Sequence, residues 1–211
     1  KKDKCIMIIH DWGSIIGTRV IRKYPELVRA VVIVDVAMMP QTNPSLVNLV
    51  MMGFIYQYML ATYFLVGLFP IFGAMFADAA IQRICKIFKS PKYDVPFTAS
   101  SAYVYFYFQL NSTLECLGLR KPFDKRHGIS VRAGAEFPPM PTLFAYAKDK
   151  DFKFHSPKFE ARLMERKDGS MVVPFGDEKN KGKPEVGHWL AHARPKKFNT
   201  AVTQFLEKLE M

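Results

Sequence analysis

Residues 5–14, Cys-Ile-Met-Ile-Ile-His-Asp-Trp-Gly-Ser, decide the fold class of this chain. The apolar run Cys5–His10 is typical of a strand that is buried on both faces of a parallel sheet. Asp11-Trp12-Gly13-Ser14 then predicts a turn, and Ile15 to Tyr24 predicts a helix. A second apolar run, Val28 to Val36, completes a strand–helix–strand unit. The N-terminal segment therefore predicts an α/β protein with a mostly parallel sheet flanked by helices.

The chain changes character after this unit. Residues 40–135 are dominated by Met, Phe and Tyr and are compatible with helical periodicity, which predicts a helical insertion. The elements expected after the Pro138-Pro139 boundary are strands over Pro141–Ala147 and Met171–Phe175 and helices over His155–Arg166 and Lys196–Leu209. We therefore expect a core formed by residues 1–39 and 136–211, with a helical cap at 40–135 inserted after the second strand.

The composition argues against two broad classes of protein, namely disordered chains and nucleic-acid-binding proteins. Of the 211 residues, 49% are hydrophobic and 23% are charged, which argues against global disorder. The net charge of +11 is dispersed in short groups such as Lys1-Lys2, Arg120-Lys121 and Lys196-Lys197. Because no nucleic-acid-binding motif accompanies this charge, we expect no nucleic-acid partner.

Three cysteines, Cys5, Cys85 and Cys116, are an odd number and form no Cys-x-x-Cys pair. A metal site and a disulfide framework are therefore not expected. We predict free, buried thiols in a reducing compartment such as the cytoplasm.

One stretch of the insertion raises the question of a membrane. No charged residue lies between Val36 and Ala77, and Met52–Phe69 is nearly long enough to span a bilayer. Gln57, Gly67 and Pro70 interrupt it. We expect buried lid helices around an apolar pocket, with a lid that contacts a membrane surface as the alternative and a spanning helix as the least favoured.

Asp11 lies where a catalytic nucleophile would be expected. A sharp turn from strand to helix lifts one side chain above the end of a sheet, an arrangement named the nucleophile elbow and usually written with Ser at its apex. Gly13 meets the need for a small residue nearby, whereas Ile9 does not. A carboxylate at the apex attacks carbon and forms an ester, and the backbone N–H of Trp12 can help to stabilise the oxyanion when that ester is hydrolysed. The structural alternative is that Asp11 caps the following helix.

His188, in Gly187-His188-Trp189, is the candidate general base. It lies on the loop between the last predicted strand and the last helix, and the hydrolysis of an ester needs a base close to the nucleophile. A carboxylate should orient this histidine. Asp35, at the end of the second strand, and Asp149 or Asp151, after the third strand, all fit that position, and the sequence does not separate them.

These motifs resemble the epoxide hydrolase and haloalkane dehalogenase branch of the α/β-hydrolases, and soluble epoxide hydrolases most closely. The resemblance rests on His-Asp-Trp-Gly followed by Tyr-Pro-Glu-Leu-Val-Arg-Ala-Val at 24–31, and on Gly-His-Trp followed by Arg194-Pro195 and Asn199. It covers roughly residues 5–40 and 138–211. Lys150-Asp151-Phe152 is similar to the usual acid position of epoxide hydrolases, while the segment Asp35 to Pro40 is similar to the acid position of some dehalogenases.

The resemblance also implies roles for residues of the cap. In epoxide hydrolases two cap tyrosines donate hydrogen bonds to the epoxide oxygen as the ring opens, which fits the need of an alkoxide for fixed donors. The candidates are one tyrosine of Tyr56 and Tyr58 and one of the group Tyr103, Tyr105 and Tyr107, with Tyr56 and Tyr105 preferred. A dehalogenase needs two halide donors. Trp12 could be one, and Trp189, beside His188, is the only other tryptophan.

The resemblance further implies about four strands and a His-Gly-x-Pro loop ahead of the elbow, which this sequence does not contain. We therefore expect an N-terminally truncated hydrolase whose first strand has an exposed edge, and activity of this chain alone is not assured. The favoured function is hydrolysis of an apolar epoxide to a diol, without metal or organic cofactor. The alternatives are a haloalkane dehalogenase and a non-catalytic protein that binds an apolar ligand or a membrane. The oligomeric state stays open.

Overall fold

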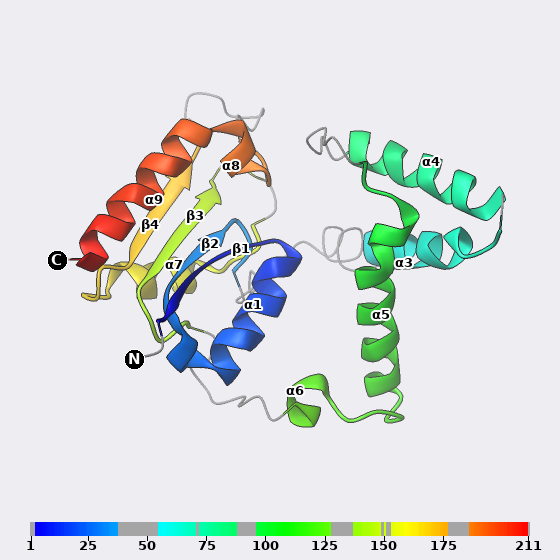
Figure 1. The fold of residues 1–211 in the computed structure, drawn as a ribbon, viewed down its shortest axis with the longest axis horizontal. Helices are drawn as coiled ribbons and strands as arrows, with labels where there is room; N and C mark the ends of the chain where they lie inside the picture. The colour runs from blue at the N-terminus through cyan, green and yellow to red at the C-terminus, as the bar shows by residue number, and fades with distance from the viewer. Residues whose placement is uncertain are drawn as a thin grey trace. The chain divides into compact units, whose positions relative to one another are not determined.

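The computed structural model describes residues 3–37, 55–70, 72–87, 96–127, 137–148, 150, 153–176 and 186–210. The chain divides into two compact units. The first consists of Lys1–Asn43 together with His127–Met211, and the second is Pro44–Arg126 (Figure 1).

The first unit contains a four-stranded parallel sheet. Its strands are β1 (Cys5–His10), β2 (Val28–Val34), β3 (Thr142–Ala147) and β4 (Met171–Phe175), in the spatial order β1-β2-β3-β4. Because all neighbouring pairs are parallel, the carboxyl ends of the four strands lie at one edge of the sheet. The apolar runs of the sequence predicted all four strands, although β2 ends two residues earlier than expected.

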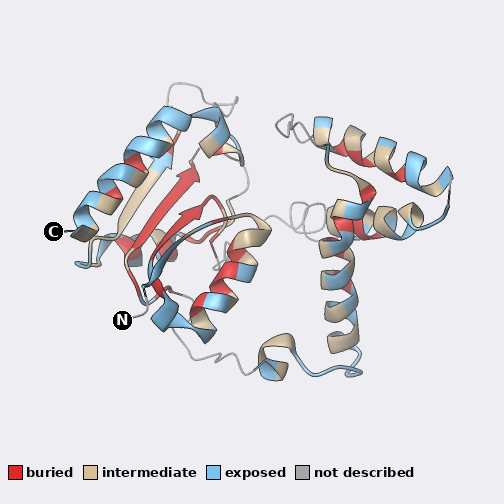
Figure 2. Ribbon diagram, viewed as in Figure 1, coloured by how far each residue is buried: buried red, intermediate tan, exposed pale blue. Residues whose placement is uncertain are grey.

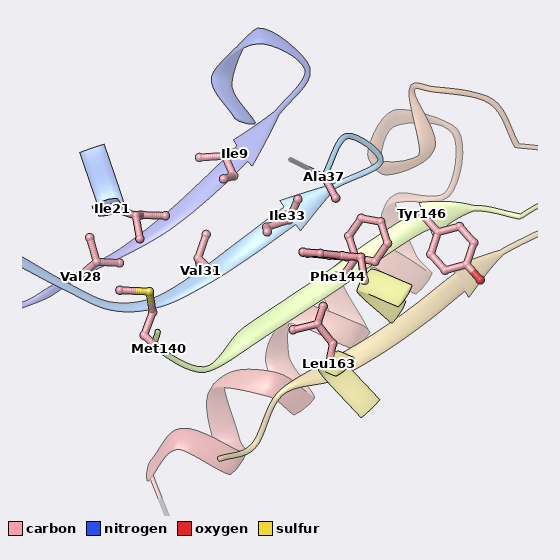
Figure 3. Close-up of a cluster of buried hydrophobic side chains, with 11 residues drawn as sticks. Ile9, Ile21, Val28, Val31, Ile33, Ala37, Met140, Phe144, Tyr146 and Leu163 are labelled. Atoms are coloured by element: carbon pink, nitrogen blue, oxygen red, sulfur yellow. The ribbon is translucent and has the colours of Figure 1, made fainter. Parts of the chain in front are cut away.

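Helices cover both faces of this sheet. On one face, α1 (Trp12–Lys23) and α7 (Pro157–Met164) pack on a cluster that includes Ile9, Ile33 and Phe144 (Figure 3). On the other face, α8 (Leu190–Ala193) and α9 (Pro195–Glu210) pack on alternate residues of the same strands. A sheet with helices on both faces explains why its strands are apolar runs rather than alternating patterns.

Burial differs between the centre and the edge of the sheet. Most of β2 and all of β3 are buried, whereas β1 has a sheet neighbour only on the β2 side among the described strands (Figure 2). Ile8 of β1 consequently has 61% of its surface exposed. The exposed edge expected from the sequence is therefore present.

The packing of α1 on β1 depends on a glycine that the sequence had not singled out. A Cβ added at Gly17 would lie 2.6 Å from Cγ2 of Ile9, so a larger residue here would force Ile9 or the helix to shift. A Cβ at Gly13 would meet nothing within 4 Å. The expectation that Gly13 supplies the small residue was wrong: Gly17 does so, and thereby leaves room for the large Ile9.

Two predicted helices differ in extent from the observed ones. The helix expected over Ile15–Tyr24 begins at Trp12, directly after Asp11, and a short 3₁₀ helix (η1, Pro25–Leu27) follows it. The helix expected to begin at His155 begins at Pro157 instead. Ser156 is its N-cap, with its Oγ accepting a hydrogen bond from the Phe159 N–H at 3.3 Å, which stabilises the start of the helix there.

The second unit is helical in its described parts. It contains α3 (Tyr56–Gly67), α4 (Phe72–Ile87), the 3₁₀ helix η3 (Ala99–Ala102), α5 (Tyr103–Cys116) and α6 (Phe123–Arg126). Small residues allow these elements to pack closely: a Cβ at Gly67 of α3 would lie 2.8 Å from Cβ of Ala99. Within the described residues, no helix has both the length and the apolar character that a membrane span requires.

Cys5, Cys85 and Cys116 form no disulfide, and they are not all buried. Cys5 and Cys116 are exposed and Cys85 is partly buried. Cys5 begins the edge strand and Cys116 ends α5, so neither belongs to an interior position of its element. The prediction of buried thiols was wrong for these two residues.

Candidate active site

Asp11 occupies a strained turn between β1 and α1. Its backbone has φ 53° and ψ −123°, a conformation that a non-glycine residue adopts only at a cost. Its side chain makes no capping hydrogen bond to α1, which removes the reason for the alternative that Asp11 is only a helix cap. The partly exposed carboxylate lies beside the N-terminus of α1, whose partial positive charge favours negative charge at this point.

His188 lies beside Asp11 and connects it to Asp35. Its Nε2 is 3.7 Å from Asp11 Oδ2, and its Nδ1 is 2.7 Å from Asp35 Oδ2. Burial would lower the pKa of His188, but the carboxylates of Asp11 and Asp35 outweigh burial and raise it above its usual value. One ring nitrogen is thus held by a carboxylate, while the other faces the candidate nucleophile, as a general base requires.

Asp35 is held by several partners. It follows the end of β2 with φ 60° and is only 2% exposed. Its Oδ1 accepts a hydrogen bond from the Ala147 N–H at 3.2 Å, and its Oδ2 accepts from His188 and from Lys150 Nζ. Burial would raise the pKa of Asp35, but the hydrogen bonds from His188 and Lys150 outweigh it and lower the pKa. Asp35 therefore stays ionised beside the histidine.

The two other candidate acids cannot be compared with Asp35 directly. Asp149 and Asp151 lie outside the described residues. Among the candidates that the structure describes, Asp35 is the one in hydrogen-bond contact with His188.

Aromatic rings surround the histidine. His10, the last residue of β1, has its Nε2 3.0 Å from the backbone carbonyl oxygen of His188, and the two imidazole rings lie 4.4 Å apart between centroids. The ring of Trp189 contacts both imidazoles edge-on. Burial and the neighbouring His188 lower the pKa of His10. A neutral His10 with its proton on Nε2 can donate to that carbonyl and hold the His188 loop against β1.

The sequence analysis missed His10 and Lys150. The available signal was position alone, because each lies at or after the carboxyl end of a strand. Lys150 was named only within Lys150-Asp151-Phe152, the segment similar to the usual acid position of epoxide hydrolases, and no role was predicted for it.

Comparisons with known proteins identify the fold. No family model matches the sequence, and no curated protein is significantly similar to it. Solved structures are similar over almost the whole chain. DBJA has a TM-score of 0.58 and 15% identity, and the match covers 98% of this chain and 68% of DBJA. A mutant epoxide hydrolase from Bacillus megaterium has a TM-score of 0.53 and 16% identity, with 97% of this chain and 69% of that chain covered, and an esterase from Thermogutta terrifontis has a TM-score of 0.53 and 12% identity, with 99% and 66% covered. The chain has the α/β-hydrolase fold.

This chain spans about two thirds of the length of those structures. Identity at this level shows the fold alone, so the activity has to be argued from the site. In an α/β-hydrolase the nucleophile, acid and histidine follow in chain order, and Asp11, Asp35 and His188 have that order. The side chain at the apex of the elbow is a carboxylate rather than a hydroxyl.

The tyrosine candidates all belong to the second unit. Tyr56 on α3 and Tyr105 on α5 are in edge-to-face contact, with ring centroids 5.9 Å apart. Tyr58 and Tyr103 are exposed on the same two helices. The two tyrosines preferred from the sequence are therefore brought together within their unit.

Proposed function

We propose that this protein is a hydrolase that opens apolar epoxides to diols through a covalent ester on Asp11. The observation that carries the proposal is the contact series Asp11–His188–Asp35, in which the residue at the strained elbow is a carboxylate. A carboxylate attacks a saturated carbon that carries a leaving group, and the strained ring of an epoxide supplies one. The chemistry needs no metal or organic cofactor.

The first step forms the ester. A carboxylate oxygen of Asp11 bonds to a ring carbon as the carbon–oxygen bond of the ring breaks. The released alkoxide takes a proton from a tyrosine hydroxyl; the resemblance to epoxide hydrolases implies this role for tyrosines of the cap, for which Tyr56 and Tyr105 are our candidates. Replacing either tyrosine by Phe should lower the turnover rate by about a hundredfold.

The second step hydrolyses the ester. His188 Nε2 takes a proton from water, and the resulting hydroxide attacks the carbonyl carbon of the ester. The backbone N–H of Trp12, at the start of α1, stabilises the tetrahedral oxyanion, which then expels the diol and restores the Asp11 carboxylate. The proton held by His188 returns through solvent to the tyrosinate left by the first step, so that both groups regain their starting states. Asp35 stabilises the imidazolium that forms in this step.

The test is diol formation from trans-stilbene oxide by the chain and its Asp11→Asn variant. Turnover should fall by at least about a thousandfold in Asp11→Asn, because an amide is a poor nucleophile. Asp3→Asn, at an exposed position of the same segment, is the matched control and should retain turnover. Equal turnover in Asp11→Asn and the control would refute the assignment of the nucleophile.

A haloalkane dehalogenase is the second candidate, and the position of the acid favours it. Asp35 follows β2, the position that resembles the acid of some dehalogenases, and it contacts His188. The same nucleophile would then displace a halide, with Trp12 and Trp189 as candidate donors. Halide release from 1-bromobutane, measured against diol formation by the same preparation, separates the two reactions.

The α3–α4 hairpin supports a further candidate function, which is contact with an anionic lipid surface. Exposed apolar side chains surround the turn, including Leu68, Phe69 and Phe72, and Phe72 is 80% exposed. Arg83 and Lys86 are exposed further along α4, where they can contact lipid phosphates.

Flotation with vesicles that contain phosphatidylserine tests this candidate. The chain should float with the vesicles, and the Phe69→Ser/Phe72→Ser variant should not. Leu119→Ser, which changes an exposed leucine elsewhere in the unit, is the control. A chain that stays unbound, or that self-associates through these phenylalanines instead, contradicts a lipid partner.

A further inference from the structure

Lys150 shares its carboxylate with the candidate base. The Nζ of Lys150 and the Nδ1 of His188 both contact Oδ2 of Asp35, so one oxygen accepts from two donors. The other oxygen, Oδ1, accepts from the Ala147 N–H. The carboxylate is thus fixed from three directions, and Lys150 is the partner that carries a full charge at neutral pH.

The surroundings of Lys150 are not those of a surface lysine. Its side chain is 13% exposed, and its ammonium lies 4.6 Å from the centre of the Phe154 ring. Burial lowers the pKa of Lys150, and the contact with Asp35 opposes that effect. A cation held in such a place is costly unless it is paired, so the ion pair with Asp35 is what allows it to be there.

Four ionisable groups act on His188. Asp11 and Asp35 favour its protonated form. A positive charge on Lys150, which contacts the same Asp35 oxygen, or on His10, whose ring centroid lies 4.4 Å from that of His188, would oppose it. In the free protein two carboxylates favour the imidazolium form of His188, whereas only Asp35 does so once Asp11 is esterified. A cation on the Asp35 oxygen opposes this effect in both states and so favours the neutral imidazole that accepts a proton from water.

We propose that Lys150 is a positioning residue of the His188–Asp35 pair, which fixes the Asp35 carboxylate and limits the proton affinity of the imidazole. Its role in turnover rests on the proposed function, whereas its effect on the imidazole does not. Arg at this position preserves the charge, and Met preserves only the aliphatic stem.

The test is an NMR titration of the His188 imidazole in the full chain, with the signal assigned by its loss in His188→Gln. In Lys150→Met the pKa of His188 should rise by about one unit, because a positive charge within roughly 5 Å has been removed. Lys150→Arg should keep the parent value. Lys158→Met, which removes an exposed lysine from α7, is the matched control and should also keep it.

Two results would overturn the proposal: an unchanged pKa in Lys150→Met, or an equal change in Lys150→Arg, which would indicate a steric effect. Lys150→Gln is measured in parallel, and far-UV circular dichroism confirms that each variant is folded. If any variant forms diol, the acid limb of its pH–rate profile should move with its NMR pKa. A shifted pKa without diol formation in the parent chain contradicts the proposed function and leaves the role of Lys150 standing.

Discussion

At the scale of single residues, backbone strain marks the candidate site. Asp11 and Asp35 are the non-glycine residues with positive φ in the described part of the chain, and both contact His188. Strained backbone persists only where the surroundings hold it in place, and it concentrates at functional sites. Two such residues that meet on one histidine argue for function more strongly than either does alone.

The identity of the acid gives the first prediction. Asp35→Asn should lower the turnover rate by about three to four orders of magnitude, because the amide cannot stabilise the imidazolium. The pKa of His188 should fall in the same variant, since one of the carboxylates that raise it is gone. Asp151→Asn is the matched comparison, because the sequence left both residues open. A larger loss in Asp151→Asn than in Asp35→Asn would contradict the assignment.

The buried residue His155 is expected to make the stability of the chain depend on pH. His155 is 1% exposed, its Nε2 lies 2.7 Å from Glu160 Oε1, and its Nδ1 has no hydrogen-bond partner. Burial lowers its pKa below 6.5 despite Glu160. Between the folded-state pKa and 6.5 the unfolded chain binds more protons, so stability contributed by neutral His155 is present above pH 6.5 and is lost as the pH falls.

Replacing this histidine should flatten that dependence. In His155→Gln the free energy of unfolding, measured by urea denaturation, should decrease less steeply as the pH falls below 6.5, by up to about 1.4 kcal/mol per pH unit. His192→Gln changes an exposed histidine on α8 and should keep the parent slope. Equal slopes in the parent and His155→Gln would show that His155 does not titrate with unfolding.

At the scale of elements, the packing of α1 on β1 explains how a large residue is tolerated next to the elbow. Ile9 precedes Asp11 by two positions, and its Cγ2 fills the space that a Cβ at Gly17 would need. The small residue that permits close packing here is therefore Gly17 on the helix, and not a residue of the strand. Asp11 directly precedes the first residue of α1, so its carboxylate lies next to the N-terminus of that helix.

This pairing predicts a coupled pair of substitutions. Gly17→Ala should destabilise the chain by about 1–3 kcal/mol through overpacking. In an Ile9→Ala background the same change should cost clearly less, because the clashing methyl group is absent. Gly13→Ala, in the same helix but without a neighbour within 4 Å, is the control and should be close to neutral. Additive effects of Gly17→Ala and Ile9→Ala in thermal unfolding would contradict this account.

At the scale of the whole molecule, the sequence predicted the sheet but not the contacts within the site. Apolar runs such as Cys5–His10 predict strands because both faces of the sheet are covered by helices. The order of elements also named Asp11 and His188 as candidate site residues, and their catalytic roles stay a prediction. The role of Asp35 could not be separated from that of Asp151, because the choice depends on which side chain approaches His188 in space.

Lys150 is a second residue whose contacts could not be predicted from the sequence. Lysine alternating with aspartate in the sequence is typical of a solvated loop, yet in the folded chain the ammonium of Lys150 contacts Asp35 and the ring of Phe154. Close packing between segments far apart in the chain leaves no local pattern. Tyr56 and Tyr105 are an intermediate case, because the resemblance to epoxide hydrolases named them as the preferred pair, whereas their ring contact follows from the packing of α3 on α5.

The most direct test of the central claim is the covalent intermediate itself. In His188→Gln the ester can form but its hydrolysis lacks the base, so an incubation with trans-stilbene oxide should raise the mass of the protein by that of one epoxide molecule. Peptide mapping should locate the addition on Asp11, and the Asp11→Asn/His188→Gln double variant should remain unmodified. An unmodified His188→Gln protein, or an addition to any other residue, would contradict the assignment of Asp11 as the nucleophile.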